Sequence, residues 1–302
     1  MLFQLAFFCE VGELAHSHLV DSLVNLEHNV IVIDNLSANN EKFYFNNKAI
    51  YHKIDICDLE KLKPIFKNID YVFHLAAESR IQPSIENPLK AVNVNVIGTT
   101  NILQLSLQNN VKRVIYSSTS AVYGLSCSFP TNENENIDCL NPYSATKFAG
   151  EEMARCFNKL HDLDVCIFRY FNVYGERSPV SGPYSLVVGI FLDQFKNNKK
   201  LTVVGTGENL RDFIHVKDIV DVNLAAMNCE KKLNADIFNI GFGKNYKILD
   251  IAKIISNEIE FVAPRIGEAK TTLADITKAK NELNWIPNIE IETWLADQKK
   301  LL

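Results

Sequence analysis

Short apolar runs alternate with longer amphipathic stretches over the first 171 residues. We expect strands at residues 2–9, 29–34, 49–55, 71–76, 114–118 and 164–170. Helices are predicted between them at residues 17–26, 59–66, about 88–109 and about 144–161. Apolar strands separated by amphipathic helices are typical of a parallel sheet that helices cover on both faces. The pattern therefore predicts an α/β fold with a doubly wound parallel sheet.

The pattern changes after residue 171. Residues 178–184 contain two prolines and one glycine, and the elements that follow are shorter. We expect a large domain at residues 1–171 and a smaller α/β domain at 172–211 and 241–302. A segment at about 212–240 would return to the large domain, with a helix near 212–228.

Composition narrows the classes of partner. The 302 residues are 47% hydrophobic, which suffices for two domains, and the net charge is −5 with no strongly basic cluster. Nucleic acid is therefore not an expected partner. No stretch approaches about 20 apolar residues, so no membrane span is expected. The seven cysteines form no CxxC pair, which argues against a metal site or a disulfide framework and favours a reducing cytoplasm.

One pentapeptide, Tyr143-Ser144-Ala145-Thr146-Lys147, separates a phenol from an amine by four residues. On a helix these two side chains lie on the same face. A free tyrosine has a pKa near ~10, and a neighbouring ammonium or nicotinium ring would lower that pKa. The spacing predicts an acid/base tyrosine tuned by a lysine. It also occurs in ordinary amphipathic helices, so the pentapeptide alone does not decide.

A hydroxyl-rich segment at residues 116–124 favours the catalytic interpretation. It follows a predicted strand and contains Ser117, Ser118 and Thr119. These hydroxyls would lie at the carboxyl end of the strand, which is where open α/β sheets bind their ligands.

With these motifs in place, the chain resembles a known family from about Ser17 to its C-terminus. It is similar to the extended short-chain dehydrogenases/reductases, in the NAD-dependent epimerase/dehydratase group, and within that group to the UDP-glucose and UDP-N-acetylglucosamine 4-epimerases. The resemblance implies a Rossmann-type large domain that binds NAD and a smaller domain that binds a UDP-sugar. The matching segments are SHLVDSL, VIVIDNLS, HLAA, NVNVIGT, YSSTSAVYG, PYSATK, RYFNVYG, RDFIHVKD and LADITKAKNELNW.

The resemblance also implies roles for single residues. Thr119 would hydrogen-bond the sugar O4, Tyr143 would exchange a proton with that oxygen, and Lys147 would bind the nicotinamide ribose. Asp34 would bind the adenosine ribose, and a carboxylate there favours NAD over NADP because it repels a 2′-phosphate. A turn-forming role is the alternative for Asp34. Eight further residues would contribute to the cofactor site: Gly12, Asn35, Asp55, Ile56, Ala76, Ala77, Asn95 and Tyr170.

On the substrate side, Asn172 and Arg211 resemble the residues that hold the UDP diphosphate. A planar guanidinium suits that group because it can donate two hydrogen bonds at once. An ion pair with Asp212 or Asp218 is the alternative for Arg211. The ends of the segment RIGE, Arg265 and Glu268, resemble a motif that contacts phosphate and uridine ribose, with Glu in place of the usual Asp.

Two positions bear on the reaction and its substrate. Thr272 occupies a place where members restricted to UDP-glucose and UDP-galactose carry a bulky Tyr, so the resemblance leans towards UDP-GlcNAc/UDP-GalNAc. Residues 181–184 also resemble members that handle N-acetylhexosamines. Dehydratases of the group carry an Asp-Glu pair directly after the catalytic Thr, whereas Ser120 and Ala121 follow Thr119 here.

The first loop departs from the family pattern, which is Gly-x-x-Gly-x-x-Gly. The three glycine positions hold Glu10, Glu13 and His16, and Gly12 lies out of register. The glycines let the backbone approach the cofactor pyrophosphate, whereas two carboxylates repel it. Three interpretations stay open: a degraded relative, a loop rebuilt around Gly12, or an aberrant reading of the first residues of the gene. We expect weakened cofactor binding with an intact fold.

Together these observations predict NAD-dependent 4-epimerisation of a UDP-sugar through a transient 4-keto intermediate. One alternative is another nucleotide-sugar oxidoreductase or dehydratase of the group. The other is a pseudoenzyme that binds nucleotide sugar without NAD. The resemblance further implies a homodimer that is held by a four-helix bundle of the helices near 88–109 and 144–161.

Overall fold

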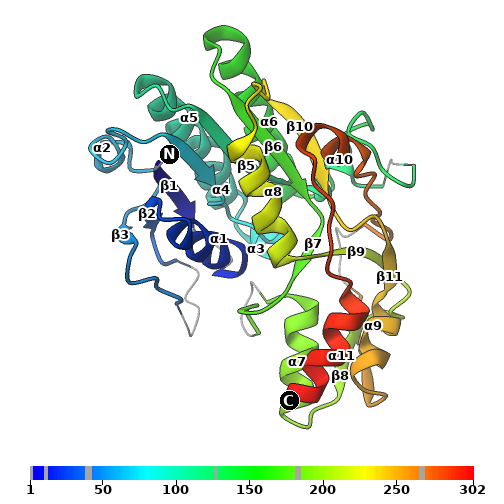
Figure 1. Cartoon of the computed structure of the whole chain (residues 1–302). Helices are drawn as coiled ribbons and strands as arrows, with labels where there is room; N and C mark the ends of the chain where they lie inside the picture. Colours follow the sequence, from blue (N-terminus) through cyan, green and yellow to red (C-terminus); the bar gives the residue numbers. More distant parts are fainter. Residues whose placement is uncertain (1–2, 10–12, 38–42, 126–127, 181–184, 265–268) are drawn as a thin grey trace.

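The computed structural model describes residues 3–9, 13–37, 43–125, 128–180, 185–264 and 269–302 (Figure 1). Within these ranges the main sheet has seven strands, all parallel, in the order β10-β6-β5-β4-β1-β2-β3. The predicted doubly wound parallel sheet is therefore confirmed. The strands are β1 (Gln4–Cys9), β2 (Asn29–Asp34), β3 (Ile50–Lys53), β4 (Tyr71–His74), β5 (Arg113–Thr119), β6 (Val165–Tyr170) and β10 (Asp236–Ile240).

Helices cover both faces of this sheet, because neighbouring strand residues point to opposite sides. On β5, Val114 packs into one hydrophobic core and Ile115 into the other. One face is covered by α1 (Glu13–Asn25), α8 (Val216–Asn228) and α10 (Thr277–Leu283), and the other by α2 (Leu59–Leu62), α5 (Thr99–Gln108) and α6 (Pro142–His161).

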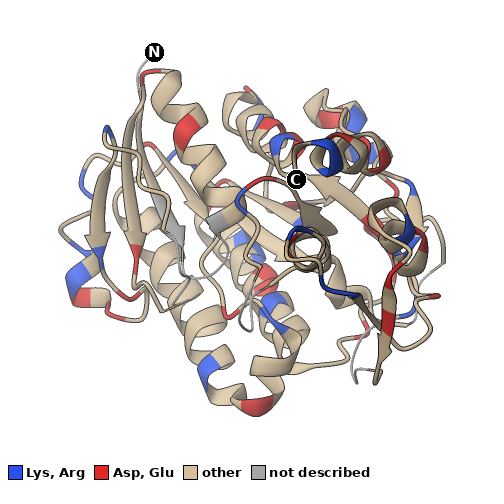
Figure 2. Ribbon diagram, turned by 90° about the horizontal axis from the view of Figure 1, so that it is seen from below, with Lys and Arg blue, Asp and Glu red and all other residues tan. Residues whose placement is uncertain are grey.

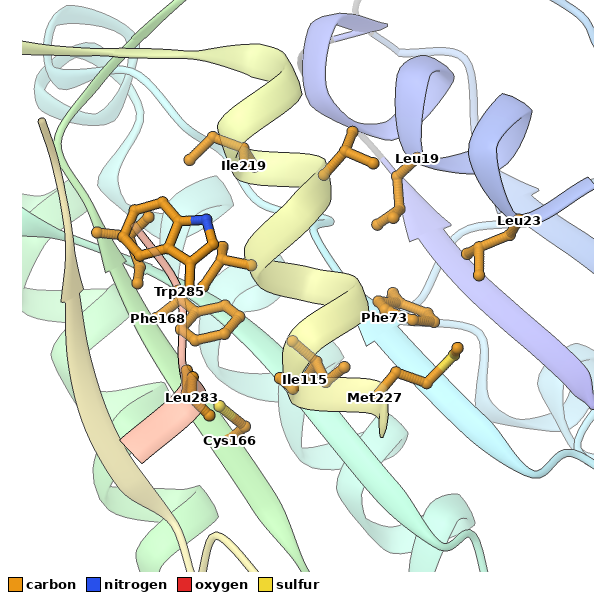
Figure 3. Packing of buried hydrophobic residues seen from close by; sticks show 14 of the residues in the cluster. Leu19, Leu23, Phe73, Ile115, Cys166, Phe168, Ile219, Met227, Leu283 and Trp285 are labelled. Atoms are coloured by element: carbon orange, nitrogen blue, oxygen red, sulfur yellow. The ribbon is translucent and has the colours of Figure 1, made fainter. Parts of the chain in front are cut away.

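Figure 3 shows the first of these cores at close range. Helix α8 passes between Leu19 of α1 and Trp285, with Phe73 and Phe168 of the sheet beneath it. All four side chains are almost completely buried. Residues far apart in the chain are thus joined around one helix.

A smaller unit lies at one end of the main sheet (Figure 1). Its core contains Phe191, Ile251 and Leu295. It holds a three-stranded sheet of β11 (Asn245–Lys247), β9 (Leu210–His215) and β7 (Asn172–Tyr174), and a pair of β8 (Leu201–Val204) and β12 (Ile259–Val262). Its helices are α7 (Val187–Lys196), α9 (Ile248–Ile255) and α11 (Ile291–Leu301).

Three elements differ from the sequence-based expectations. The long helix near 88–109 consists of α4 (Pro88–Val92), a π-helical segment (Asn93–Gly98) and α5. The helix near 212–228 begins only at Val216, because the residues before it form β9 and pair with β7. The short helix α3 (Ile81–Glu86) was not predicted.

Charged residues of both signs are distributed over many elements of the fold. Lysines and arginines lie among aspartates and glutamates on the helices and loops visible in Figure 2. In the part of the chain that the structure describes, no helix combines the length and the apolar character that crossing a membrane requires.

A buried ion pair fixes the loop that precedes β10. The Nε of Arg113 lies 2.7 Å from Oδ2 of Asp164, and both side chains are about 5% exposed. The same carboxylate accepts hydrogen bonds from the backbone N–H groups of Leu233 and Asn234, at 2.8 and 3.0 Å. One aspartate therefore holds together β5, β6 and the approach to β10.

We expect Asp164→Ala to lower the free energy of unfolding by about 3–5 kcal/mol, because it leaves the Arg113 charge buried and unpaired. Denaturant titration followed by circular dichroism measures this loss. Lys232→Ala, which removes an exposed ion pair with Asp162 nearby, should change stability by less than about 1 kcal/mol. Equal effects of the two variants would contradict the prediction.

Candidate active site

A cavity of about 470 Å³ opens at the carboxyl edge of the main sheet. It lies where the strand order reverses, since β1 is flanked by β2 on one side and β4 on the other. Ligands of open α/β sheets bind at such a switch point. The wall includes Thr119, Tyr143, Lys147 and Tyr170 from the main sheet and α6, and Asn172, Arg211 and Thr272 from the smaller unit.

Thr119 and Tyr143 meet in this cavity. Thr119 is the last residue of β5, and its hydroxyl accepts a hydrogen bond from the N–H of Ala121 at 3.1 Å. Tyr143 lies in the first turn of α6, which Asn141 and Ser144 begin with a capping box. The side chains of Thr119 and Tyr143 both line the cavity. The structure thus brings together two residues that lie 24 positions apart in the sequence.

The pKa of Tyr143 results from opposing effects. Burial raises it above its ordinary value, whereas the nearby Thr119 hydroxyl and the positive charge of Arg80 lower it. The expectation that the Lys147 ammonium lowers this pKa stays a prediction. Arg80 lies directly before α3.

Lys147 follows one turn after Tyr143 and is only 1% exposed. Its Nζ lies 4.3 Å above the ring of Tyr116 and, among the described residues, has no hydrogen-bond partner. Burial lowers the pKa of Lys147 to about 7, although the nearby Glu151 carboxylate raises it. A buried amine without acceptors is costly, and the hydroxyls of a nucleotide ribose are the kind of acceptor it lacks. The donor set therefore fits a nicotinamide cofactor.

A second buried ion pair lies one helical turn beyond Lys147. Arg169 of β6 donates to Glu151 of α6 from Nε at 3.0 Å and from Nη2 at 2.6 Å. The hydroxyl of Ser118 donates to the same carboxylate at 2.5 Å. The pair thereby joins α6 to the strand end that carries Thr119. The only feature of the sequence that points to this ion pair is the spacing of four residues between Lys147 and Glu151.

At the same carboxyl edge of the sheet, nearer to β3, Asp34 ends β2, and its register partner on β1 is Cys9. Its carboxylate accepts from the N–H of Leu36 at 2.7 Å, and burial raises the pKa of Asp34 to about 6. Next to it, Asn35 donates to Asp55 at 3.1 Å. Three of the residues expected at the cofactor site therefore lie at or just after the ends of β2 and β3.

The other residues expected at the cofactor site divide into two groups. Ala77 and Tyr170 belong to the cavity wall. Ile56, Ala76 and Asn95 are buried away from it.

Asn95 instead ties the chain after β4 to α6. It accepts from the N–H of Glu78 at 2.8 Å and donates to the hydroxyl of Thr146 at 2.9 Å. His74 is completely buried, and its Nε2 lies 2.8 Å from the hydroxyl oxygen of Thr99.

The substrate side of the cavity is built on β7 and β9. Asn172 donates to the carbonyl of Asp212 at 2.9 Å and to the hydroxyl of Thr272 at 3.2 Å. Arg211 donates to the carbonyls of Leu210 and Lys270 at 3.0 and 3.2 Å, and its side chain reaches the wall.

The carboxylates that we considered as ion-pair partners of Arg211 accept backbone hydrogen bonds. Asp212 accepts from Phe242, Gly243 and Ala274. Asp218 accepts from Asn288 and Ile289.

Several expectations lie outside the described residues. These are Gly12 and Glu10 of the first loop, Arg265, Glu268 and residues 181–184. Within the described part, α1 begins at Glu13, and His16 is buried on it with its ring 6.0 Å from that of Phe43.

Known proteins are similar to this chain in sequence and in fold. Residues 16–241 match the model of the NAD dependent epimerase/dehydratase family. A putative UDP-glucose 4-epimerase of Methanocaldococcus jannaschii is 36% identical over 284 residues, which is 91% of each chain.

Two solved structures are similar over nearly the whole chain. UDP-glucose 4-epimerase of Thermotoga maritima, with UDP-glucose, has a TM-score of 0.90 and 31% identity over 98% of this chain and 97% of its own. UDP-N-acetylglucosamine 4-epimerase of Methanobrevibacter ruminantium, in complex with UDP-N-acetylmuramic acid, has a TM-score of 0.88 and 32% identity over 99% and 97%. The sheet, the cavity and these matches together show that the chain belongs to the NAD-dependent epimerase/dehydratase family.

Proposed function

We propose that the protein catalyses NAD-dependent 4-epimerisation of a UDP-sugar, with UDP-GlcNAc and UDP-GalNAc as the favoured pair. The observation that carries this proposal is that Thr119, Tyr143 and Lys147 line the same cavity, with the buried amine of Lys147 one helical turn after the phenol of Tyr143. The matches to UDP-sugar 4-epimerases support the same reaction.

Each of these side chains has a task in the reaction. When bound, NAD supplies the hydride acceptor and donor for the sugar C4. Tyr143 takes the proton of the sugar O4 and later returns it, so its phenol works as both base and acid. Thr119 donates or accepts a hydrogen bond at the same oxygen and orients it. The 4-keto sugar turns in the cavity between the two half-reactions, while Asn172 and Arg211 hold the diphosphate.

On the cofactor side, Lys147 binds the nicotinamide ribose through its free amine. Asp34, Asn35 and Asp55 bind the adenosine, and Gly12, Ile56, Ala76, Ala77, Asn95 and Tyr170 shape or support the rest of the site. We assign NAD binding to residues 1–171 with the returning segment 212–240, and nucleotide-sugar binding to 172–211 and 241–302. Arg265 and Glu268 belong to the latter assignment. The continuous sheet that includes β10 supports the returning segment.

The preference for N-acetylated sugars rests on Thr272. Its hydroxyl is bonded to Asn172 and to the N–H of Asp212, at 3.2 and 3.1 Å, and its side chain is short where a tyrosine would fill the cavity. A fitting pocket for an extra substituent contributes only ~1–3 kcal/mol, so UDP-hexoses are expected as slower substrates.

We further propose a cytoplasmic homodimer. Exposed apolar residues on the two expected bundle helices support it: Leu89, Val92, Ile97 and Leu160 are 75%, 41%, 48% and 75% exposed. The cysteines Cys57, Cys139, Cys156, Cys166 and Cys229 are free thiols, in keeping with a reducing compartment.

We expect Tyr143→Phe to reduce the conversion of UDP-GlcNAc to UDP-GalNAc by about 10²–10⁴-fold, because the O4 proton loses its acceptor. Chromatography of the products measures the rate. Tyr246→Phe, which removes a hydroxyl bonded to Glu292 outside the cavity wall, should retain activity. If wild type binds UDP-GlcNAc but not NAD, the protein is a pseudoenzyme and the proposal fails.

Thr272→Tyr should lower kcat/KM for UDP-GlcNAc by about 10–200-fold and leave that for UDP-glucose within a few-fold, because the ring fills the space of the N-acetyl group. Competition between the two substrates in one reaction gives the ratio directly. Thr272→Val separates loss of the hydroxyl from loss of space. An unchanged substrate ratio in Thr272→Tyr would contradict the assignment.

NAD affinity should depend on pH through Asp34. Its pKa of about 6 means that the carboxylate becomes protonated as the pH falls through 6, and a protonated carboxyl accepts ribose hydroxyl hydrogen bonds less well. We expect calorimetry to give a larger Kd at pH 5 than at pH 7.5. Asp34→Asn should bind more weakly at pH 7.5 and lose most of this dependence.

A further inference from the structure

Helix α8 carries one amide side chain that its apolar surroundings do not explain. Asn223 is completely buried, and other residues of the same helix, such as Ile219 and Val222, pack into the core shown in Figure 3. The side-chain oxygen of Asn223, Oδ1, has no hydrogen-bond partner among the described residues. Burying an unpaired amide oxygen costs free energy, and a leucine of similar branched shape would avoid that cost. The stability of the core therefore gives no reason for an asparagine at this position.

The amide nitrogen of Asn223 joins α8 to the strand end beside the cavity. Its Nδ2 donates to the carbonyl of Ile219, one turn earlier, at 2.7 Å and to the hydroxyl of Tyr170 at 2.8 Å. The first bond fixes the amide against its own helix, and the second reaches the last residue of β6. Tyr170 belongs to the cavity wall, and Asn223 is buried behind it. Asn223 thus holds the outer end of the Tyr170 ring.

Tyr170 lies beside residues that we assign to the reaction. In the parallel pairing of β5 and β6, its register partner is Thr119, and Ser117 is paired with Phe168. Paired residues of neighbouring strands point to the same face of a sheet, so Tyr170, Thr119 and Ser117 share one face. All three line the cavity. The orientation of the Tyr170 ring therefore affects the space next to Thr119.

The phenol of Tyr170 differs in character from that of an acid/base residue. Burial raises the pKa of Tyr170 above its ordinary value, although the nearby Ser117 and Asn223 side chains lower it in part. The phenol therefore stays protonated near neutral pH. Its oxygen accepts from Asn223, which leaves its own hydrogen free to donate. Tyr170 is thus a neutral aromatic wall with a hydroxyl that is fixed from behind.

We propose that Asn223 is a positioning residue of the cofactor site, which holds the Tyr170 ring in the orientation that the nicotinamide end of the cofactor requires. Without this bond the ring would rotate about its side-chain torsions and populate other orientations. A ligand that binds only one of several orientations binds more weakly, in proportion to the fraction of protein that is competent. This inference rests on the proposed function, because that proposal assigns Tyr170 to the cofactor site.

The first test is the affinity of Asn223→Leu for NAD, measured by calorimetry on protein freed of cofactor. We expect a Kd about 3–10-fold larger than that of wild type, because one neutral hydrogen bond changes an equilibrium constant by about this factor. The Kd for UDP should stay unchanged, since Asn172 and Arg211, which we assign to the diphosphate, lie on β7 and β9.

Thermal unfolding separates this role from a structural one. Leucine removes an unpaired amide oxygen and adds apolar contacts, so Asn223→Leu should unfold near the wild-type temperature. A residue that served only stability would lower the unfolding temperature of the variant and leave its Kd for NAD unchanged. That result would overturn the inference.

A double-mutant cycle tests whether Asn223 acts through Tyr170. Tyr170→Phe removes the hydroxyl that accepts the bond, and the variant that combines it with Asn223→Leu places two apolar side chains together. If the amide acts only through this hydroxyl, the combined variant should bind NAD as Tyr170→Phe does. An effect of Asn223→Leu that is equally large with and without the Tyr170 hydroxyl would contradict the proposal.

Asn109→Leu is the matched control. Asn109, at the end of α5 and outside the cavity wall, donates to the carbonyl of Leu105 four residues earlier at 2.9 Å, as Asn223 does to that of Ile219. It lacks the counterpart of the bond to Tyr170, so Asn109→Leu should bind NAD as wild type does. An equal loss of NAD affinity in Asn109→Leu and Asn223→Leu would overturn the inference.

The two proposals fail separately. If wild type binds NAD but epimerises no UDP-sugar, and Asn223→Leu binds NAD more weakly through Tyr170, the proposed function is wrong and the inference is right. If epimerisation occurs and Asn223→Leu binds NAD as wild type does, only the inference is wrong.

Discussion

The site depends on one buried ion pair, between Glu151 of α6 and Arg169 of β6. A helix whose first turn carries Tyr143 and a strand that ends at Thr119 could slide past one another, because apolar packing alone has little directional preference. The carboxylate that also accepts from Ser118 removes this freedom. Removing one partner of such a pair costs about 3–5 kcal/mol, so a displaced helix is strongly disfavoured. The contact between Thr119 and Tyr143 follows from this attachment.

The same region is tied a second time on its other side. Asn95 bonds to Thr146, and Ser84 bonds to the backbone of Tyr143. The first turn of α6 is therefore held by hydrogen bonds from α3 and from the π-helical segment, both of which follow β4. The side chains in the cavity keep their geometry without needing a ligand, and such preorganisation avoids reorganisation during the reaction.

The sequence predicted those features of the fold and site that local patterns determine, and missed those that depend on contacts between distant segments. The main sheet was predictable because its strands are apolar runs and its helices are amphipathic. The segment before Val216 was predicted wrongly because an apolar stretch beside a helix looks helical until its pairing with β7 is known. Thr119 and Tyr143 could be singled out from local chemistry. The place of Arg80 in the cavity wall could not be predicted, because it depends on α3. This six-residue helix contains Pro83 and polar residues and shows no helical repeat of apolar positions.

The returning strand β10 has a consequence for how the chain folds during synthesis. Residues 236–240 complete the main sheet beside β6, and α10 covers the core near Trp285. A chain that ends after residue 171 contains a sheet with β6 as an unpaired edge, a surface that invites pairing with other chains. Residues of the smaller unit must be synthesised before the larger sheet can close. Folding therefore cannot proceed unit by unit from the N-terminus, and truncation after residue 171 would yield an aggregation-prone fragment.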